Sequence, residues 1–324
     1  MERSPCSGVR NSYRTRYLGE VSGLKEKDFI NTIKTVLNSP LIGDDCAYLE
    51  SLGIVVTQDS LVEDVHFSTS FITPFQLGWK SAMVNISDIC ASGAEPKYLT
   101  VALSLPKTIE ADFVEEFYKG MKAACGKVEI AGGDITGSDK IFISVTAIGK
   151  CGDRRISSRK NARAGHKIII SGNHGSSGAG FRLLKEGKQT PESLIHAHLM
   201  PEARVEFSKK IASSIKENYA MMDTSDGLAD ALSQIAEASG VSMEIDFSKI
   251  PYDKEIEMFS DFEDLILFGG EDYGLVAAVP EEITTDFTII GEVREGSGIT
   301  ILKQDKKFHL SNAKVSEKLF NHFN

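Results

Sequence analysis

The sequence predicts an α+β protein built from two mixed α/β domains. Apolar segments with the period of strands and others with the period of helices follow one another, without the strict alternation that a doubly wound parallel sheet requires. A basic stretch of low apolar content, residues 150–166, separates two halves of the chain. The 324 residues suffice for two domains, and 41% hydrophobic against 25% charged residues is the balance of an ordinary globular protein.

Regular structure in the first half is expected to begin near Lys25, where apolar residues from Phe29 to Leu37 repeat at helical spacing. A long helix is predicted after Thr73, which can cap it, with Pro74 in its first turn and an apolar stripe that ends before Gly93. The other elements expected in this half are strands at 48–49, 53–57, 98–105, 128–131 and 141–148 and a helix at 109–124.

The second half is expected to open with a strand at 167–171 that leads into the glycine-rich segment Gly172–Gly180. This segment precedes a helix and could wrap phosphate groups, but a flexible loop or a simple helix start fits it equally well. The remaining elements expected here are helices at 178–186, 202–217 and 228–238 and strands at 219–222, 241–246 and 273–279. We therefore divide the chain into a flexible tail at 1–24, an N-terminal domain at 25–150 and a C-terminal domain at 151–324.

Charge and cysteine content exclude several classes of protein. The net charge of −10, from 36 basic and 46 acidic residues, argues against a nucleic-acid binder, whose surface should be basic. The five cysteines are scattered without a CxxC pair, so we expect free thiols in a reducing cytosol. No apolar run approaches the ~20 residues that span a bilayer. The sequence thus predicts a cytoplasmic protein with neither a membrane nor a nucleic-acid partner.

Carboxylates gather in predicted turns beside apolar strands. The segments are Gly43-Asp44-Asp45, Gln58-Asp59, Gly132-Gly133-Asp134 and Asp223-Thr224-Ser225-Asp226-Gly227, and Asp88 adds a carboxylate on the long helix. Each segment alone is an ordinary turn. If the fold brought them together without cations, mutual repulsion would raise their pKa values and weaken folding. Magnesium prefers such hard oxygen ligands and shares its shell with substrate phosphates, so the pattern favours a metal site.

Phosphoryl transfer is the chemistry that suits these residues best. The Walker signature and the protein-kinase catalytic loop are both absent, and no Ser-His-Asp or Cys-His grouping stands out. Metal-assisted phosphoryl transfer depends mainly on positioning and charge neutralisation, and it asks little of other side chains. A non-catalytic metal-binding or scaffolding protein stays an alternative.

Six segments in order are specific enough to indicate a family. They are Gly43–Ala47, Thr57–Phe67, Val84–Ile89, Gly132–Thr136, Asp223–Leu228 and Gly269–Tyr273. From about residue 26 to the C-terminus the chain resembles the thiamine-monophosphate kinases. The wider superfamily, with aminoimidazole ribonucleotide synthetase and selenophosphate synthetase, shares the acidic segments and supplies the nearest alternatives. The segments around His66 and Glu271 point to the thiamine branch, and Cys6 lacks the glycine-rich setting of a selenophosphate synthetase cysteine.

The resemblance implies a PurM-like architecture whose N-terminal domains pair in a homodimer. It implies ATP as co-substrate, several Mg²⁺ ions, and conversion of thiamine monophosphate to thiamine diphosphate. By motif position it implies a metal shell of Asp45, Thr57, Gln58, Asp59, Asp88, Asp134, Asp223 and Asp226, of which the aspartates other than Asp59 form the catalytic set. It further implies nucleotide contacts from Tyr118, Gly133, Asp134, Arg159 and Ser225. The contacts to the thiamine substrate that it implies come from His66, Glu271 and Phe320.

Some of these residues have plainer interpretations that stay open. His66 could be a satisfied histidine at a strand end, Tyr118 a core residue and Arg159 a solvated charge. Gln58 stands where the family often has threonine, which does no harm if the contact is made by backbone oxygen. Phe320 stands where tyrosine or tryptophan is frequent, and it could simply anchor the tail.

The implied acceptor suggests a mechanism. A phosphate monoester is mostly dianionic at pH 7 and needs no general base to become a nucleophile. The obstacle is repulsion from ATP, roughly 4 kcal/mol per pair of unit charges at ~4 Å and an effective dielectric of 20. Cations held by the aspartates would offset this repulsion, so we expect direct transfer without a phosphoenzyme.

Overall fold

The computed structural model describes residues 26–304 and 306–319. The predicted tail at 1–24 therefore lies outside the described residues. The chain divides into two units, and the first contributes helix α2 (Glu26–Leu37), which confirms the helix expected from the Phe29–Leu37 periodicity. The second unit, Leu41–Leu319, contains all the other described elements.

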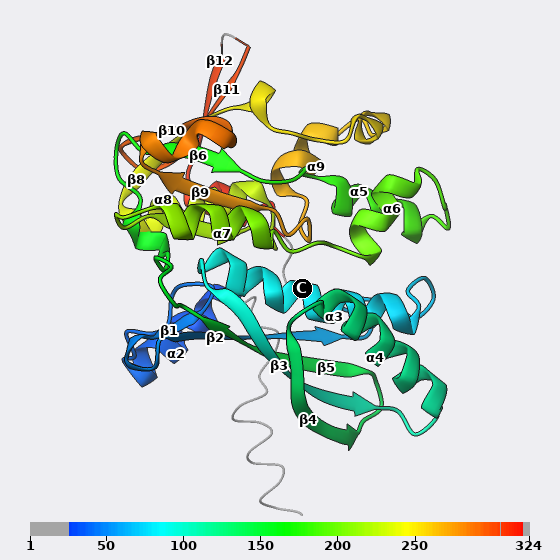
Figure 1. Ribbon diagram of the computed structural model, residues 1–324. Coiled ribbons are helices and arrows are strands. Elements are labelled where there is room, and N and C mark those ends of the chain that lie inside the picture. The colour runs from blue at the N-terminus through cyan, green and yellow to red at the C-terminus, as the bar shows by residue number, and fades with distance from the viewer. Residues whose placement is uncertain (1–25, 305, 320–324) are drawn as a thin grey trace, which may run out of the picture. The chain divides into compact units, whose positions relative to one another are not determined.

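The first half of the second unit is a five-stranded mixed sheet with two helices on one face (Figure 1). Its strands, in spatial order, are β1 (Ala47–Leu49), β2 (Ile54–Val62), β5 (Phe142–Lys150), β3 (Glu95–Leu105) and β4 (Glu129–Gly137). Strands β3 and β4 run parallel, and the other neighbours are antiparallel. The helices are α3 (Pro74–Ala91) and α4 (Ala111–Cys125).

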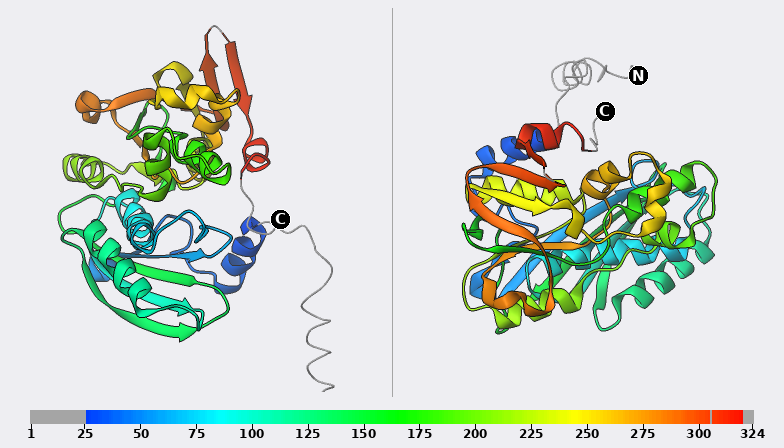
Figure 2. Two further views of the ribbon diagram at one scale, coloured as in Figure 1. Left: turned by 90° about the vertical axis from the view of Figure 1, so that its right-hand side faces the viewer. Right: turned by 90° about the horizontal axis from the view of Figure 1, so that it is seen from above.

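Helix α3 is the central element of the unit. As predicted, it starts at a capping box of Thr73 and Gln76, with Pro74 in the first turn. A β-carbon on Gly78 would lie 1.9 Å from the carbonyl oxygen of Phe117, so glycine lets α3 and α4 pack backbone to backbone. On its other side α3 contacts β7 (Ala220–Asp223) and α7 (Val205–Ser214), and it lies between the first sheet and the second half of the unit (Figure 2). Polar side chains of α3 are thereby buried between two layers.

The second half is a seven-stranded mixed sheet with helices packed around it. Its order is β12-β11-β8-β10-β6-β9-β7, with β8 and β11 parallel and the other neighbours antiparallel. Besides β7, the strands are β6 (Lys167–Ile170), β8 (Val241–Asp246), β9 (Leu275–Val279), β10 (Thr288–Glu295), β11 (Gly298–Lys303) and β12 (Lys306–Leu310). Besides α7, the helices are α5 (Ser176–Lys185), α6 (Glu192–Leu199), α8 (Leu228–Ser239), α9 (Phe262–Phe268) and α10 (Asn312–Ser316). Short 3-10 turns occur at Glu50–Leu52, Arg159–Asn161, Phe247–Lys249, Lys254–Met258 and Glu281–Asp286. Two mixed sheets with helices confirm the predicted α+β class.

Several details differ from the sequence-based expectation. Gly132-Gly133-Asp134 and Gln58-Asp59 lie inside β4 and β2, so the prediction of turns was wrong there. A β-carbon on Gly133 would lie 1.8 Å from the carbonyl oxygen of Val101, which shows that this glycine permits a close strand pairing. Helices α6 and α9 and strands β10–β12 were not predicted. Strand β9 starts only at Leu275, because Tyr273 has a left-handed backbone with φ +47°.

Candidate active site

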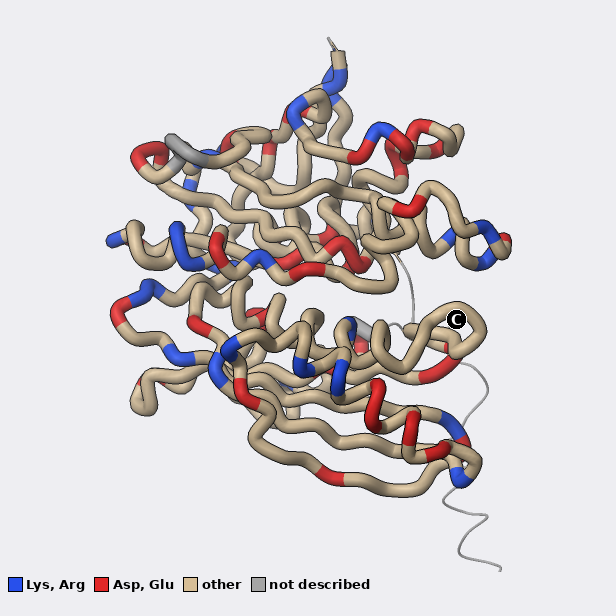
Figure 3. Tube along the Cα trace, turned by 45° about the vertical axis from the view of Figure 1, so that its right-hand side comes forward, with Lys and Arg blue, Asp and Glu red and all other residues tan. Residues whose placement is uncertain are grey.

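Three carboxylates converge beside α3. Asp45, Asp88 and Asp223 each present an oxygen atom, and these atoms all lie within 4.8 Å of one another. Asp45 lies in the loop before β1, Asp88 in the last turns of α3, and Asp223 at the end of β7. The packing of α3 against β7 joins residues that are far apart in the sequence. Figure 3 marks the acidic positions of the trace in red. We call Asp45, Asp88 and Asp223 the carboxylate cluster.

Neighbouring polar groups orient the carboxylate cluster. The hydroxyl of Thr57 donates to Asp88 Oδ2 at 2.6 Å, and the hydroxyl of Ser87 donates to Asp223 Oδ2 at 2.7 Å. The backbone N–H of Asp59 donates to Asn85 Oδ1 at 3.0 Å, which ties β2 to the buried face of α3. Such bonds hold ligand side chains in place before a cation arrives.

Burial makes the carboxylate cluster hard to ionise without a cation. Desolvation, together with neighbouring carboxylates, raises the pKa of Asp88 well above its ordinary value. The same causes raise the pKa of Asp223 to about 7, and burial also raises the pKa of Asp45. The charge of Asp59 contributes to both Asp88 and Asp223, so this residue faces the same space. Carboxylates packed this closely attract a divalent cation, because the cation removes their mutual repulsion.

Arg159 supplies a positive charge at one edge of the carboxylate cluster. Its Nη2 donates to Asp45 Oδ1 at 2.9 Å, and its backbone N–H donates to Asp44 Oδ1 at 2.8 Å. Its Nη1 donates to Gln234 Oε1 at 2.5 Å, so the guanidinium is anchored on α8. The side chain is only 17% exposed, which excludes the interpretation of a solvated linker charge. A guanidinium beside a cation site suits contact with phosphate.

A second loop joins the carboxylate cluster through Ser225. The carbonyl oxygen of Ser225, two residues after Asp223, accepts the backbone N–H of Glu271 at 2.6 Å. A β-carbon on Gly270 would lie 2.8 Å from that carbonyl, so the approach depends on glycine. Glu271 itself has φ +66°, a left-handed conformation that is unusual for a residue with a side chain. Strain of this kind is concentrated at functional sites.

The carboxylate of Glu271 is held by basic residues from two helices. Its Oε1 lies 3.1 Å from Lys80 Nζ of α3, and its Oε2 lies 3.4 Å from His198 Nδ1 of α6. Burial alone would raise the pKa of Glu271, but the neighbouring basic groups, Lys80 above all, outweigh it and lower that pKa. His66 Nδ1 accepts the backbone N–H of Val62 at 3.0 Å. The site thus offers an ionised carboxylate next to a histidine.

The comparisons with known proteins agree with this geometry. Two domain families match the chain. The N-terminal domain of AIR synthase related proteins matches residues 43–151, and their C-terminal domain matches residues 163–303. A thiamine-monophosphate kinase of Aquifex aeolicus is 39% identical over 316 residues, which cover 93% of this chain and 98% of that protein. The chain belongs to the thiamine-monophosphate kinase family. The Bacillus subtilis thiamine-monophosphate kinase is 34% identical, over 93% of this chain and 100% of its own length.

Solved structures extend the likeness to three dimensions. The structure of AaThiL complexed with AMPPCP and TMP is 38% identical, covers 91% of this chain and 98% of its own, and superposes with a TM-score of 0.82. The hydrogenase maturation protein HypE, at 22% identity and a TM-score of 0.66, shares the fold alone. The PurM-like architecture is therefore confirmed, and within this superfamily the kinase branch is favoured over the synthetases that the sequence left as alternatives.

Most of the site residues implied by the family resemblance lie together. Thr57, Asp59 and Arg159 adjoin the carboxylate cluster, and His66 adjoins Glu271. Asp226 is exposed and follows Asp223 in the same turn. It acts electrostatically on buried Tyr273 together with Asp223 and Asp59, so it borders the same region.

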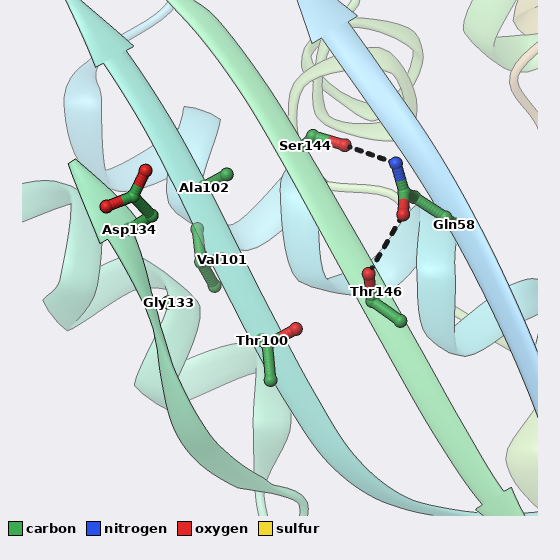
Figure 4. A pocket seen from close by; sticks show the side chains of 8 residues that line it. All are labelled: Gln58, Thr100, Val101, Ala102, Gly133, Asp134, Ser144 and Thr146. Atoms are coloured by element: carbon green, nitrogen blue, oxygen red, sulfur yellow. Dashed lines mark hydrogen bonds between the residues drawn. The ribbon is translucent and has the colours of Figure 1, made fainter. Parts of the chain in front are cut away.

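Three predicted site residues lie away from the carboxylate cluster within this chain: Gln58 and Asp134, expected as metal ligands, and Gly133, expected with Asp134 as a nucleotide contact. A metal contact from the backbone oxygen of Gln58 and the nucleotide contacts of Gly133 and Asp134 stay predictions. In β2 the side chains of Thr57 and Gln58 point to opposite faces of the sheet. Gln58 Nε2 donates to Ser144 at 3.1 Å, and its Oε1 accepts from Thr146 at 3.1 Å, on the face away from α3 (Figure 4). Gly133 and Asp134 line the same shallow cavity of about 220 Å³ on that face. The two-residue period of a strand explains this separation.

Tyr118 and Phe320 are the two remaining residues that the family resemblance implies. Tyr118 is half-buried on α4, where its ring packs edge-on against Phe117 with centroids 5.4 Å apart. Phe320 lies outside the described residues. Their implied contacts to nucleotide and thiamine stay predictions.

Sequence reasoning missed Lys80, His198, Asn85 and Ser87. A signal for Lys80 was present, because Lys80 and Asp88 are the only charged residues of the α3 sequence. A charged residue on a helix that is apolar on most sides is seldom buried unless it has a partner. His198 carried no such signal, since its role depends on α6 lying beside α3.

Other expectations concern the compartment. Cys46, Cys90, Cys125 and Cys151 are buried free thiols, as predicted for the cysteines in the described part of the chain. Among the described residues, no helix combines the length and apolar character needed to span a membrane.

Proposed function

We propose that this protein transfers the terminal phosphate of ATP directly to thiamine monophosphate and so forms thiamine diphosphate. One observation carries the proposal: an anchored guanidinium, Arg159, contacts the buried carboxylate cluster, and a backbone hydrogen bond to Ser225 joins the loop of Glu271 to the turn that follows Asp223. The names of the relatives and the AaThiL structure with AMPPCP and TMP support the same reaction. We also propose that the protein acts in the cytoplasm, as the sequence led us to expect.

The carboxylate cluster fits Mg²⁺ as the cation of the site. Its donors are hard oxygens on short stems, and burial raises the pKa values of Asp88 and Asp223, so a bound cation would favour their ionised forms. We propose Asp45, Asp88 and Asp223 as the principal ligands, with Thr57, Asp59 and Asp226 completing the shell. Bound magnesium would neutralise phosphate charge and so lower the repulsion between the two substrates.

The other residues of the site bind and orient the substrates. Arg159, fixed by Asp45 and Gln234, is placed to contact nucleotide phosphate. Glu271 offers its carboxylate to the cationic thiamine end of the acceptor, and His66 borders it. The hydroxyls nearest the carboxylate cluster, on Thr57 and Ser87, already donate to Asp88 and Asp223, so they are poorly placed as covalent nucleophiles. This supports direct transfer.

The decisive experiment measures ADP release with thiamine monophosphate present and absent, in Mg²⁺ and in EDTA, and identifies the product by mass spectrometry. We expect ADP and thiamine diphosphate in equal amounts, only when both thiamine monophosphate and Mg²⁺ are present. ADP release that ignores thiamine monophosphate would refute the proposed acceptor. Isolation of a covalent phosphoenzyme during turnover would refute the direct route.

We also propose that two copies pair through the outer face of the first sheet, the face that carries Gln58 and Asp134. Its centre bears small polar side chains, including Thr100, Ser144 and Thr146, and its two ends carry the exposed rings of Tyr98 and Phe142. In such a pair Asp134 and Gln58 would meet the second copy.

The dimer is tested by light scattering after size-exclusion chromatography. Thr100→Arg places a charge at the centre of the proposed face and is expected to give a monomer, whereas the wild-type protein elutes with twice the monomer mass. Lys122→Arg, on the exposed side of α4, is the control and should leave the dimer intact. A monomeric wild-type protein, or a dimeric Thr100→Arg variant, would contradict this arrangement.

A further inference from the structure

Lys80 is a fully buried lysine that the proposed chemistry does not use. It lies on α3, its side chain is 1% exposed, and Glu271 is the acidic residue within 4 Å of its Nζ in the part of the chain that the structure describes. Burying an ammonium group costs desolvation free energy, so buried lysines are generally paired with an opposite charge. The pair is therefore a built feature of the site.

The two sides of the Glu271 carboxylate are chemically different. On the buried side lie Lys80 Nζ at 3.1 Å and His198 Nδ1 at 3.4 Å. Burial lowers the pKa of His198 to about 3, so this imidazole is neutral at pH 7 and Lys80 supplies the full positive charge on that side. The Glu271 side chain keeps 29% of its surface exposed. One side of the carboxylate is thus anchored and the other is open to a ligand.

Helix α3 carries both Lys80, which contacts Glu271, and Asp88 of the carboxylate cluster. Lys80 and Asp88 are eight residues apart on one continuous helix, which corresponds to about 12 Å along its axis. A two-ring molecule with a phosphate arm can bridge such a distance, with its phosphate at the carboxylate cluster and its rings at Glu271. A rigid helix therefore sets the spacing between the two ends of the substrate site.

We propose that Lys80 is a positioning residue for the acceptor: it keeps Glu271 ionised and in one orientation, so that the open side of the carboxylate binds the cationic thiamine end. This inference rests on the proposed function. Lys80 itself touches no substrate. It acts through Glu271, and its loss should therefore weaken acceptor binding and leave ATP binding largely unchanged.

The test compares wild type, Lys80→Met, Glu271→Gln and the double variant, with Lys122→Met on the exposed side of α4 as the matched control. We expect KM for thiamine monophosphate to rise roughly 30-fold in each single variant. KM for ATP should change less than about threefold, because the carboxylate cluster and Arg159 remain intact. The double variant should be no worse than the more severe single variant, since both substitutions remove the same interaction. The control should match the wild-type protein.

Binding without turnover gives an independent measurement. Trp79 is the only tryptophan of the chain and directly precedes Lys80 in α3. Its Nε1 donates to the carbonyl oxygen of Pro201 at 2.8 Å. Its fluorescence should follow titration with thiamine monophosphate in the absence of ATP, with Kd weakened in Lys80→Met and partly restored in Lys80→Arg. If the effects of Lys80→Met and Glu271→Gln multiply in the double variant, or if KM for ATP rises as much as that for the acceptor, the inference is wrong.

Failure of the proposed function would look different. If wild-type protein neither binds nor converts thiamine monophosphate, the acceptor is wrong, and the same four proteins still test the pairing by thermal unfolding. Each single variant should then lose several degrees of Tm, and the double variant should recover part of the loss, because no unpaired buried charge remains. Additive losses of Tm would show that Lys80 and Glu271 do not act as a pair.

Discussion

Replacing Asp88 with asparagine is expected to lower kcat by roughly 100-fold or more while the fold persists. Even residues that only support a metal ligand cost about 10–100-fold in affinity or activity when they are changed. Asp88 is one of the three members of the carboxylate cluster, whose oxygens all lie within 4.8 Å of one another. Asparagine removes a negative charge there and can turn N–H donors toward the cation. The measurement is kcat at saturating Mg²⁺, with circular dichroism as the check on folding.

Asp112→Asn is the matched control for this variant. Asp112 is exposed in the first turn of α4 and belongs to the same half of the unit as Asp88. Its replacement should leave kcat unchanged within twofold. An Asp88→Asn enzyme that turns over within about fivefold of wild type would remove Asp88 from the proposed metal shell.

Asp223→Asn is expected to stabilise the magnesium-free protein above pH 7 and to lose this advantage near pH 4. The pKa of Asp223 is about 7 in the folded protein, against an ordinary value of 3.8. A carboxyl whose pKa is raised by folding binds its proton more tightly in the folded state. Its contribution to stability therefore falls as pH rises from about 4 to about 7. Asparagine cannot ionise and avoids this loss, which is at most about 4 kcal/mol.

The measurement is the free energy of unfolding by denaturant in EDTA at several pH values, taken as the difference between Asp223→Asn and wild type. His174 and His198, whose pKa values burial lowers to about 4 and about 3, destabilise both proteins on acidification and cancel in the difference. Added Mg²⁺ should stabilise wild type more than the variant. A difference that is constant across pH would show that Asp223 is not strained by its charge in the metal-free protein.

Local sequence signals predicted those elements whose reasons are themselves local. Thr73, Pro74 and Gly93 marked the limits of α3, because capping groups and prolines act on the nearest turn of a helix. The basic segment at 150–166 stays our proposed boundary between domains. Strands β10–β12 were missed. For β12 the reason is that most of its residues are exposed and show little apolar alternation.

The candidate site was predicted in part for the same reason. Asp45 and Asp223 could be singled out because their carboxylates stand in acidic segments beside apolar strands, and Asp88 because it adds a carboxylate on the long predicted helix. Asp134 was assigned to the same cluster, yet it lies on the opposite face of the sheet. The cause is the two-residue period of a strand, in which a shift of one residue moves a side chain to the other face. Gly132 and Gly133 suggested a turn, so the sequence did not show that Asp134 lies in a strand.

The amino-acid sequence by itself determined the chemistry that this protein can offer: which residues carry hard oxygen ligands, where helices start, and to which family the ordered segments are similar. Only the tertiary structure decided which of those groups face one another. Lys80 meets Glu271, and Asp88 meets Asp223, because α3 is buried between two layers that are brought together by packing over more than a hundred residues. Pairings of this kind depend on long-range burial of apolar surface, which no local pattern of residues encodes.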